Sequence, residues 1–293
     1  MAARTNVQAR LRAARAFLFD LDGTLVLGDR SNRSIRPLPG ALALLERLRS
    51  RQVPYAILTN GTVRTPLEYV HELHGAGIRV EEPLALTPSS VAAEFFKRRG
   101  FKRVRVLGVE GVWQPLEAAG IEVVRGSGPE SVDAVFVGWY REFKMDEIEA
   151  ACNAVAAGAR LFTGSLAPYF ASAQGKVLSS SRVICAAITS VTGKRATVLG
   201  KPAIEAVLCA CRRLGTDPNH LVVVGDDPAL EVFMARRVGA LGIVVRTGVW
   251  GQGEVARLPA AHRPHLALRD VAELLEVLDG FESPKPPGKK AAR

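Results

Sequence analysis

The stretch FLFDLDGTL, from Phe17 to Leu25, ends an apolar run with two aspartates and follows them at once with Gly-Thr. An apolar run of this kind is typical of a buried strand, and glycine suits the turn that would follow it. Neither role requires two like charges two residues apart. We therefore expect Asp20 and Asp22 to belong to a site at the end of a strand.

Apolar runs rich in Val, Ile, Leu and Phe recur along the chain, and each is followed by a segment with helical periodicity. The runs are AFLFDL, VPYAILTN, VRVLGV, VDAVFVGW, LVVVGDD and LGIVVRT. Strands that are apolar on both faces and alternate with amphipathic helices are typical of a parallel sheet covered on both sides. The sequence therefore predicts an α/β protein with a Rossmann-like parallel sheet.

The middle of the chain continues this strand-helix rhythm without the polar segments described below. We predict that residues 84–185 form a second α/β unit inserted into the first, which is thereby divided into 1–83 and 186–281. Turn-rich segments flank the insertion on both sides, GIRVEEPLAL and VTGKRATVLGKP. The Pro- and Lys-rich residues 282–293 are expected to be a disordered basic tail.

At 293 residues, of which 48% are hydrophobic, the chain can bury a full core. No apolar run approaches the roughly 20 residues of a membrane-spanning helix, and no signal peptide is recognised, so a cytoplasmic protein without membrane contact is expected. The Arg-rich, acid-free N-terminus would also suit an organelle transit peptide. The four cysteines lack metal-binding spacing and are expected to be reduced.

The formal net charge of +10 is concentrated at the two ends of the chain. Residues 1–15 contain four Arg and no acid, and residues 282–293 contain four basic residues and one acid, so these segments carry +7 of the +10. No basic patch with interleaved aromatic residues marks the rest of the chain. Nucleic acid is therefore not an expected partner.

Four short polar segments follow predicted strands at their C-terminal ends, where open α/β sheets bind ligands. Each segment alone has an ordinary structural explanation as a turn, a helix cap or a solvated side chain. Together they gather carboxylates and phosphate-binding groups at one edge of the sheet. They contain Asp20 and Asp22 in FDLDGT, Thr59 and Asn60 in ILTNGT, Lys201 in LGKP, and Asp226 and Asp227 in VVGDD.

Carboxylates gathered at one sheet edge would raise one another's pKa unless a cation lay among them. A hard divalent ion, preferably Mg²⁺, would neutralise Asp20 and Asp226 and could also take the backbone carbonyl of Asp22. The Thr59 hydroxyl, the Lys201 ammonium and the N–H groups of the turns are suited to phosphate. These residues therefore predict a site for magnesium and phosphate.

In their order and spacing, the four segments resemble the haloacid dehalogenase superfamily of phosphatases, whose members use D-x-D-G-T, a Thr or Ser after a second strand, a Lys, and an acidic pair. The resemblance spans Ala16 to about Gly280 and includes room for an inserted cap of the C2 type. PLPGALALLERLRSRQVPYAILTN and VDAVFVGWYREFKMDEIEAACNAVAAGARLF are similar to the subgroup that includes the N-acetylglucosamine-operon, 4-nitrophenyl, phosphoglycolate and pyridoxal phosphatases. The implied fold is a haloacid dehalogenase core with this cap.

The resemblance also implies roles for single residues. Asp20 would be the nucleophile that forms an aspartyl-phosphate, and Asp22 would protonate the leaving alcohol and then activate water. Both roles agree with the chemistry of a carboxylate pair at phosphorus. The implied phosphate-binding residues are Thr59, Asn60 and Lys201, and the implied metal-binding residues are Asp20, Asp22, Asp226 and Asp227.

One departure concerns the last acidic segment. Relatives often place a second aspartate five residues after the first acid, where this chain has Glu231, while Asp227 directly follows Asp226. Either carboxylate could hold a metal-bound water, and the spacing favours Asp227. The alternative for Glu231 is an acidic residue near a helix N-terminus, where the helix dipole favours it.

The leading functional hypothesis is magnesium-dependent hydrolysis of a small soluble phosphomonoester. Substrate choice is expected in the inserted cap, around Ser165, Tyr169 and Phe170. The oligomeric state is left open between a monomer and a homodimer through the cap, since caps of this type often pair. The alternatives are a phosphotransferase or mutase, and a phosphate-sensing protein without turnover. Phosphoglycolate, sugar phosphates, nucleotides, glycerol phosphate and pyridoxal phosphate all suit the predicted site, because its recognised residues contact only the phosphoryl group.

Overall fold

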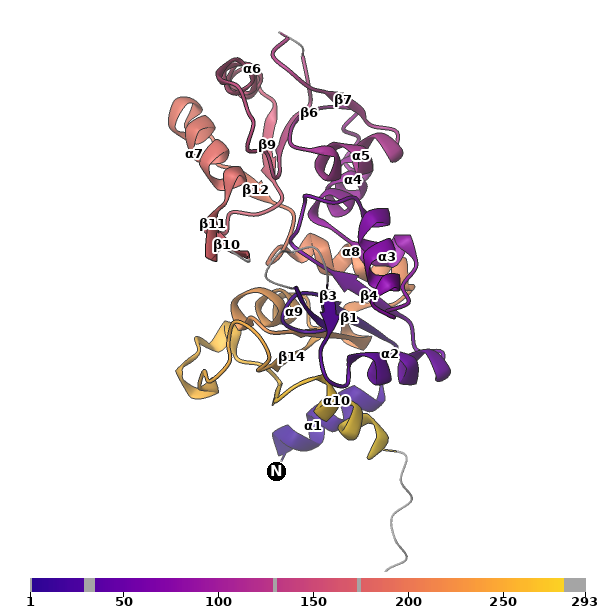
Figure 1. Cartoon of the computed structure of the whole chain (residues 1–293). Coiled ribbons are helices and arrows are strands. Elements are labelled where there is room, and N and C mark those ends of the chain that lie inside the picture. The colour runs from indigo at the N-terminus through magenta and orange to yellow at the C-terminus, as the bar shows by residue number, and fades with distance from the viewer. Residues whose placement is uncertain (1, 29–34, 129–130, 173–174, 282–293) are drawn as a thin grey trace, which may run out of the picture.

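The computed structural model describes residues 2–28, 35–128, 131–172 and 175–281. These residues form two α/β units stacked on one another (Figure 1). The larger unit, here called the core, contains the first and last described residues, and the smaller unit is called the cap. The basic tail predicted at 282–293 lies outside the described residues.

Six parallel strands form the core sheet, in the order β15-β14-β13-β1-β4-β5. The strands are β1 (Ala16–Asp20), β4 (Tyr55–Leu58), β5 (Ala85–Leu86), β13 (Leu221–Gly225), β14 (Leu241–Val245) and β15 (Leu266–Leu268). The helices of this unit are α1 (Ala2–Arg12), α2 (Ala41–Ser50), α3 (Pro66–Gly75), α8 (Ile204–Leu214), α9 (Phe233–Arg237) and α10 (Val271–Asp279). The predicted fold class is confirmed.

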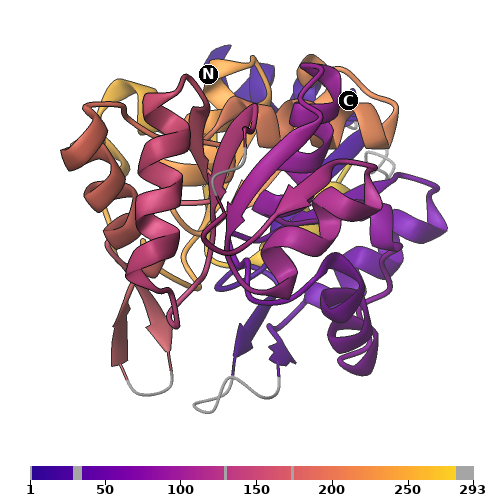
Figure 2. The same cartoon turned by 90° about the horizontal axis from the view of Figure 1, so that it is seen from above.

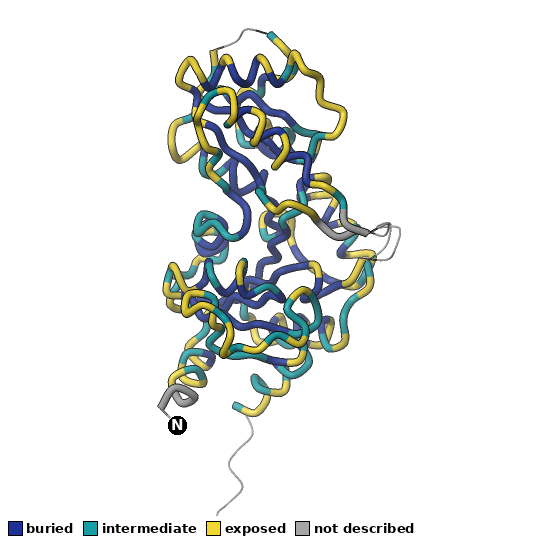
Figure 3. Tube along the Cα trace, turned by 90° about the vertical axis from the view of Figure 1, so that its left-hand side faces the viewer, coloured by how far each residue is buried: buried dark blue, intermediate teal, exposed yellow. Residues whose placement is uncertain are grey.

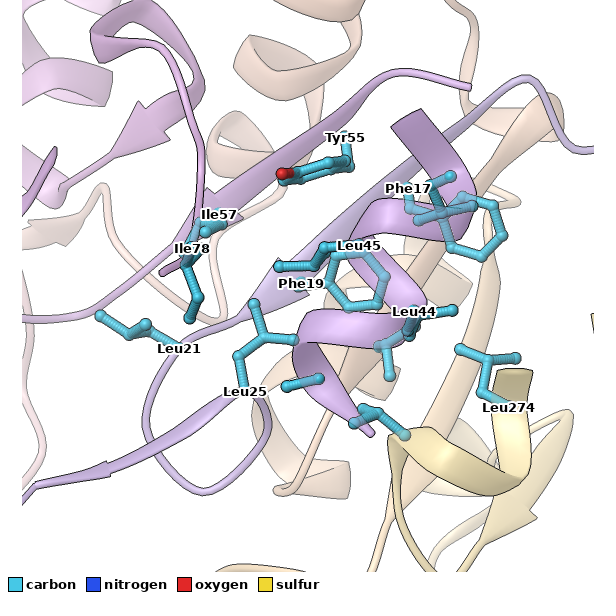
Figure 4. Close-up of a cluster of buried hydrophobic side chains, with 14 of the residues drawn as sticks. Phe17, Phe19, Leu21, Leu25, Leu44, Leu45, Tyr55, Ile57, Ile78 and Leu274 are labelled. Atoms are coloured by element: carbon cyan, nitrogen blue, oxygen red, sulfur yellow. The ribbon is translucent and has the colours of Figure 1, made fainter. Parts of the chain in front are cut away.

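Alternate residues of β1 pack on opposite faces of the core sheet. Phe17 and Phe19 lie in one apolar cluster with Leu44 of α2 and Leu274 of α10 (Figure 4). Leu18 lies in the cluster on the other face, with apolar residues of α8 and α9. Burial on both faces, at roughly 25 cal/mol per Å² of apolar surface, holds the strand in register and so positions the acid at its end.

The cap is built around a second parallel sheet, with the strand order β12-β9-β8-β6-β7. Its strands are β6 (Arg103–Leu107), β7 (Glu122–Val124), β8 (Ala134–Val137), β9 (Arg160–Thr163) and β12 (Thr197–Val198). The helices that pack on it are α4 (Pro88–Arg98), α5 (Glu110–Ala118), α6 (Met145–Ala156) and α7 (Ser180–Thr192). Figure 3 shows that the core and the cap each bury residues of their own.

The chain enters and leaves the cap at two well-defined places. Helix α4 is shared between the units, since Val91 packs in the core and Phe96 packs in the cap. On the return, α7 runs past the boundary predicted at 185, and β12 still pairs with β9 of the cap. Leu199 packs in the cap, and the Leu199 and Gly200 N–H groups donate to the carbonyls of Thr163 and Gly164, so the return to the core follows Gly200. This place lies within the turn-rich segment VTGKRATVLGKP, but a two-residue strand has no periodicity that would mark the boundary more closely.

Two antiparallel hairpins form small two-stranded sheets of their own. The core hairpin joins β2 (Val26–Gly28) to β3 (Ile35–Pro37), and the cap hairpin joins β10 (Tyr169–Ser172) to β11 (Gly175–Leu178). Figure 2 shows both hairpins projecting from the same side of the molecule. In the part of the chain that is described, no helix is long and apolar enough to cross a membrane. All four cysteines are buried and free.

Candidate active site

Three neighbouring strands of the core sheet end at the candidate site. β1 ends at Asp20, β4 is followed by Thr59, and β13 is followed by Asp226. The strands are parallel and adjacent in the order β13-β1-β4, so their carboxyl ends lie side by side. The three residues are 4%, 5% and 5% exposed, respectively. The fold thus brings together three of the residues predicted from the sequence.

Lys201 reaches this cluster from the segment that returns from the cap. Its ammonium forms a buried ion pair with Asp20 and a second one with Glu231, whose Oε1 lies 2.8 Å from Nζ. Burial alone would lower the pKa of Lys201, but the charges of Asp20 and Glu231 outweigh it and raise the pKa above its ordinary value. Lys201 is therefore a fixed positive charge beside the Asp20 carboxylate.

The Asn60 side chain holds the backbone of Lys201. The Lys201 N–H donates to Asn60 Oδ1 over 2.8 Å, and Asn60 Nδ2 donates to the Lys201 carbonyl over 3.2 Å. This pair ties the loop after β4 to the segment that leaves the cap. Asn60 thus positions Lys201, while the direct phosphate contact expected for Asn60 stays a prediction.

The turn after β1 contains Asp22, Gly23 and Thr24 and helps to orient the Asp20 carboxylate. Gly23 has a φ of +86°, and a Cβ added there would lie 2.6 Å from Asp226 Oδ2, so both its conformation and its surroundings require glycine. Thr24 Oγ1 donates to Asp20 Oδ2 over 2.9 Å. Both Asp20 oxygens are therefore oriented by the protein, one by Lys201 and the other by Thr24.

Asp226 is oriented by the loop that follows β14. The Val249 N–H donates to Asp226 Oδ2 over 2.6 Å, and the Trp250 N–H donates to the Asp226 carbonyl over 3.1 Å. A side chain on Gly248 would overlap the Asp226 carboxylate. The backbone groups that make these contacts lie about twenty residues after Asp226 in the chain, so the contacts could not be inferred from the sequence.

The structure places Glu231, and not Asp227, inside the site. Glu231 lies in the π-helical turn η3 (Pro228–Val232), is 1% exposed, and pairs with Lys201. Asp227 Oδ1 instead accepts the Ala229 N–H over 2.8 Å at the start of that turn. The longer Glu231 side chain reaches back into the site because Gly225 has no side chain in its path. Which of the two carboxylates would hold a metal-bound water stays a prediction.

The cluster contains more acids than its single lysine can neutralise. Burial, followed by the charge of Asp20, raises the pKa of Asp226 to about 6. Burial raises the pKa of Glu231 to about 8 against the opposing charge of Lys201. Asp22 is exposed as a residue, but the protein around its carboxyl group limits hydration and, with the Asp20 charge, raises the pKa of Asp22 to about 6. The site therefore favours protons or a cation.

The donor set fits Mg²⁺. Proteins commonly hold this ion through one or two carboxylates, with water and substrate phosphate completing the octahedron. Asp20 at the end of β1 and Asp226 directly after the adjacent β13 supply two buried carboxylates. The Asp22 carbonyl, expected as a further ligand, stays a prediction. Among the described residues no group of three or more His, Cys, Asp or Glu side chains is arranged to hold a metal ion.

Tyr69 of α3 is a site residue that the sequence did not reveal. Its hydroxyl shares a hydrogen bond with the Thr59 side chain, which also accepts the Gly61 N–H over 3.0 Å. Burial and then the Asp22 charge raise the pKa of Tyr69 to about 12, so the hydroxyl stays protonated. A Cβ added to Gly61 would overlap this hydroxyl. Tyr69 therefore positions Thr59, and Gly61 leaves the room for it.

We expect Gly61→Ala to lower kcat/KM by roughly tenfold or more, because the new methyl group displaces the Tyr69 hydroxyl and with it Thr59. Tyr69→Phe loses one hydrogen bond and is expected to cost roughly three- to tenfold. The double variant should be more active than Gly61→Ala alone, since removing the hydroxyl makes room for the methyl group. Steady-state kinetics of the four proteins measures this. A double variant no better than Gly61→Ala would disprove the overlap.

The three cap residues predicted for substrate choice have different surroundings. The Ser165 carbonyl accepts hydrogen bonds from Thr163 and Ser181, both within the cap. Tyr169 on β10 is 52% exposed and is therefore not part of the packed cap interior. The side chain of Phe170 lies outside the described part of the structure. Their role in substrate choice stays a prediction.

Comparisons with known proteins agree with this fold. The family model of haloacid dehalogenase-like hydrolases matches residues 17–122, and a second, HAD-hydrolase-like model matches residues 198–274. The chain is 28% identical to the 5'-nucleotidase YutF of Bacillus subtilis over 240 residues, which cover 82% of this chain and 90% of that protein. The two matched regions contain every strand that ends at the candidate site.

Two solved structures share the whole arrangement of core and cap. A 4-nitrophenylphosphatase from Thermotoga maritima superimposes with a TM-score of 0.80 at 26% identity, covering 91% of this chain and 98% of that one. A glycerol phosphate phosphatase from Mycobacterium tuberculosis, solved in complex with magnesium, superimposes with a TM-score of 0.79 at 25% identity. The match covers 90% of this chain and 77% of that one. The fold and the site thus define a phosphatase with an inserted cap. The chain belongs to the haloacid dehalogenase-like hydrolases, as its resemblance predicted.

Proposed function

We propose that the protein hydrolyses a small phosphomonoester through an aspartyl-phosphate on Asp20, with Mg²⁺ as cofactor. The observation that carries this proposal is the different environment of two carboxylates two residues apart. Asp20 is buried and held at both oxygens by Lys201 and Thr24. Asp22 is accessible to solvent and has a pKa raised to about 6. The first suits a fixed nucleophile and the second suits an acid and base.

In the first step, an Asp20 oxygen attacks phosphorus while the bond from phosphorus to the ester oxygen breaks. Asp22 gives its proton to the departing alcohol. In the second step, Asp22 removes a proton from water, whose oxygen attacks the same phosphorus and releases phosphate and the Asp20 carboxylate. Lys201 and Thr59 donate to the phosphoryl oxygens as charge develops. Mg²⁺, held by Asp20 and Asp226, would supply charge neutralisation for the phosphoryl group.

The substrate class is tested by a screen of phosphorylated metabolites with Mg²⁺, in which released phosphate is measured. YutF is named a 5'-nucleotidase, and the mycobacterial neighbour is named a glycerol phosphate phosphatase. We therefore propose a small phosphorylated metabolite, with the cap contributing selectivity. Hydrolysis predicts free phosphate from one or more esters. Transfer of the phosphoryl group to an added alcohol or sugar, with no free phosphate, would support the phosphotransferase alternative instead.

We expect removal of divalent cations with EDTA to abolish phosphate release and Mg²⁺ to restore it. Mg²⁺ should also raise Tm more at pH 8 than at pH 5. Asp226 and Glu231 have pKa values raised from 3.8 to about 6 and from 4.5 to about 8, so the folded metal-free protein holds extra protons between these limits, and its stability falls as pH rises from about 4 to about 8. At pH 5 these protons compete with Mg²⁺. Thermal melts with EDTA or Mg²⁺ at both pH values measure this, and an equal shift would contradict it.

A homodimer through the cap remains part of the proposal. Several large apolar side chains are exposed on cap helices, with Met145 at 76%, Val191 at 73% and Val183 at 39%. Exposed apolar surface of this kind is common at protein interfaces. These residues support an association through α6 and α7.

A further inference from the structure

Three nitrogen-bearing side chains meet at the edge of the core sheet opposite the candidate active site. Arg10 lies on α1, Arg236 lies on α9, and His265 immediately precedes β15. β14 and β15 begin at this edge, whereas the catalytic carboxylates stand where β1 and β13 end. The proposed hydrolysis therefore gives these three residues no role.

The His265 ring lies between two N–H donors. The Gly242 N–H donates to Nδ1 over 3.0 Å, so the neutral ring carries its proton on Nε2. Arg10 Nη1, which can only donate, lies 3.3 Å from that Nε2. Two N–H groups thus face one another without an acceptor, and a protonated ring would add a further donor. An oxygen placed beside both groups would accept from each.

The charges around His265 also favour a ligand that accepts hydrogen bonds. Arg10 Nη2 donates to the Gly239 carbonyl over 2.6 Å, and Arg236 Nη1 donates to the Arg263 carbonyl over 3.1 Å. Neither arginine forms a salt bridge with any residue that the structure describes. Burial lowers the pKa of both Arg10 and His265, and the Arg236 charge lowers both further. Two like charges near a ring that presents a donor favour an anion.

We propose that Arg10, Arg236 and His265 form a binding site for a small oxyanion, either inorganic phosphate or the phosphoryl group of a metabolite. Such an anion offers several acceptor oxygens, so it can take hydrogen bonds from Arg10 Nη1 and His265 Nε2 at once. Arg236 is exposed, and its positive charge acts on both Arg10 and His265, so it supplies the second cation of the site. An apolar or cationic ligand would leave both donors unsatisfied.

The test compares phosphate-induced thermal stabilisation of the wild type with three variants. Arg236→Gln should raise the phosphate concentration for half-maximal stabilisation by roughly tenfold, and Arg236→Lys should fall between it and the wild type. Arg237→Gln is the matched control, because it removes the same charge from the same helix but its guanidinium lies over the Phe233 ring, 5.5 Å from the centroid. Phosphate bound at the catalytic site contributes equally in all four proteins.

The control variant should stay within about twofold of the wild type. Methyl phosphate in a parallel titration separates the two sources, since a site for the free ion prefers phosphate and a site for a phosphorylated metabolite binds both. Crystals soaked in selenate should show an anomalous peak between Arg10 and His265. The proposal would be overturned if Arg236→Gln and Arg237→Gln raised the phosphate concentration for half-maximal stabilisation equally. Selenate bound elsewhere, with none between Arg10 and His265, would also overturn it.

Discussion

Asp20→Asn is expected to lower kcat/KM by about 10⁴-fold or more for every phosphomonoester that the protein hydrolyses. An amide oxygen is a far weaker nucleophile than a carboxylate, and it cannot form an aspartyl-phosphate. The substitution also removes the charge that faces Lys201. The effect should therefore appear in kcat, with no rescue by higher substrate concentration.

Folding of the Asp20→Asn variant can be separated from its chemistry. Lys201 keeps its second partner, Glu231, and Thr24 can still donate to the amide oxygen, so we expect a Tm close to that of the wild type. Asp217→Asn is the matched control, because Asp217 caps the turn η2 (Pro218–His220) with an exposed side chain. Released phosphate and thermal melts measure both variants. Metal-dependent hydrolysis retained by purified Asp20→Asn would disprove the proposed nucleophile.

Asp22→Asn is expected to have the second largest effect, and that effect should depend on the leaving group. For an alkyl phosphate, whose alcohol must be protonated as it leaves, we expect a loss of about 10³-fold or more. For 4-nitrophenyl phosphate the leaving group needs little protonation in the first step, so the rate of that step should fall much less. The second step remains slow for both esters, because the amide that replaces the Asp22 carboxylate cannot remove a proton from water.

These unequal effects give a direct signature. A variant that forms the aspartyl-phosphate faster than it hydrolyses it should release a burst of 4-nitrophenol, followed by slow turnover. Intact-protein mass spectrometry should then find one added phosphoryl group, which hydroxylamine removes. Equal losses for the alkyl and aryl esters, without a phosphorylated protein, would show that Asp22 is not the acid and base.

The position of Glu231 shows what spacing along the chain does not reveal about the last acidic segment. Asp227 is closer to Asp226 in the sequence, but its side chain is used by the Ala229 N–H at the start of a helical turn. Glu231 lies one turn later, where its carboxylate meets Lys201. Which acid faces the site depends on helix geometry and on the space beside Gly225, and neither is visible in a linear pattern.

The extent of the cap shows a similar limit. The strand-helix rhythm predicted an inserted unit, since its strands are apolar and its helices are amphipathic. Its last strand has only two residues and is recognised only by its pairing with β9. Helix α4 contributes to both hydrophobic interiors, so no change in composition marks the point at which the chain enters the cap.

The sequence by itself determined the α/β class and the acids Asp20, Asp22 and Asp226, because strand signals and the polar residues after them are local. Parallel strands then bring their carboxyl ends together whatever lies between them. Only the tertiary structure decided which groups hold these residues in place. Lys201 pairs with Glu231, Tyr69 meets Thr59, and the Arg10 and His265 donors face one another, because packing joins segments far apart in the chain.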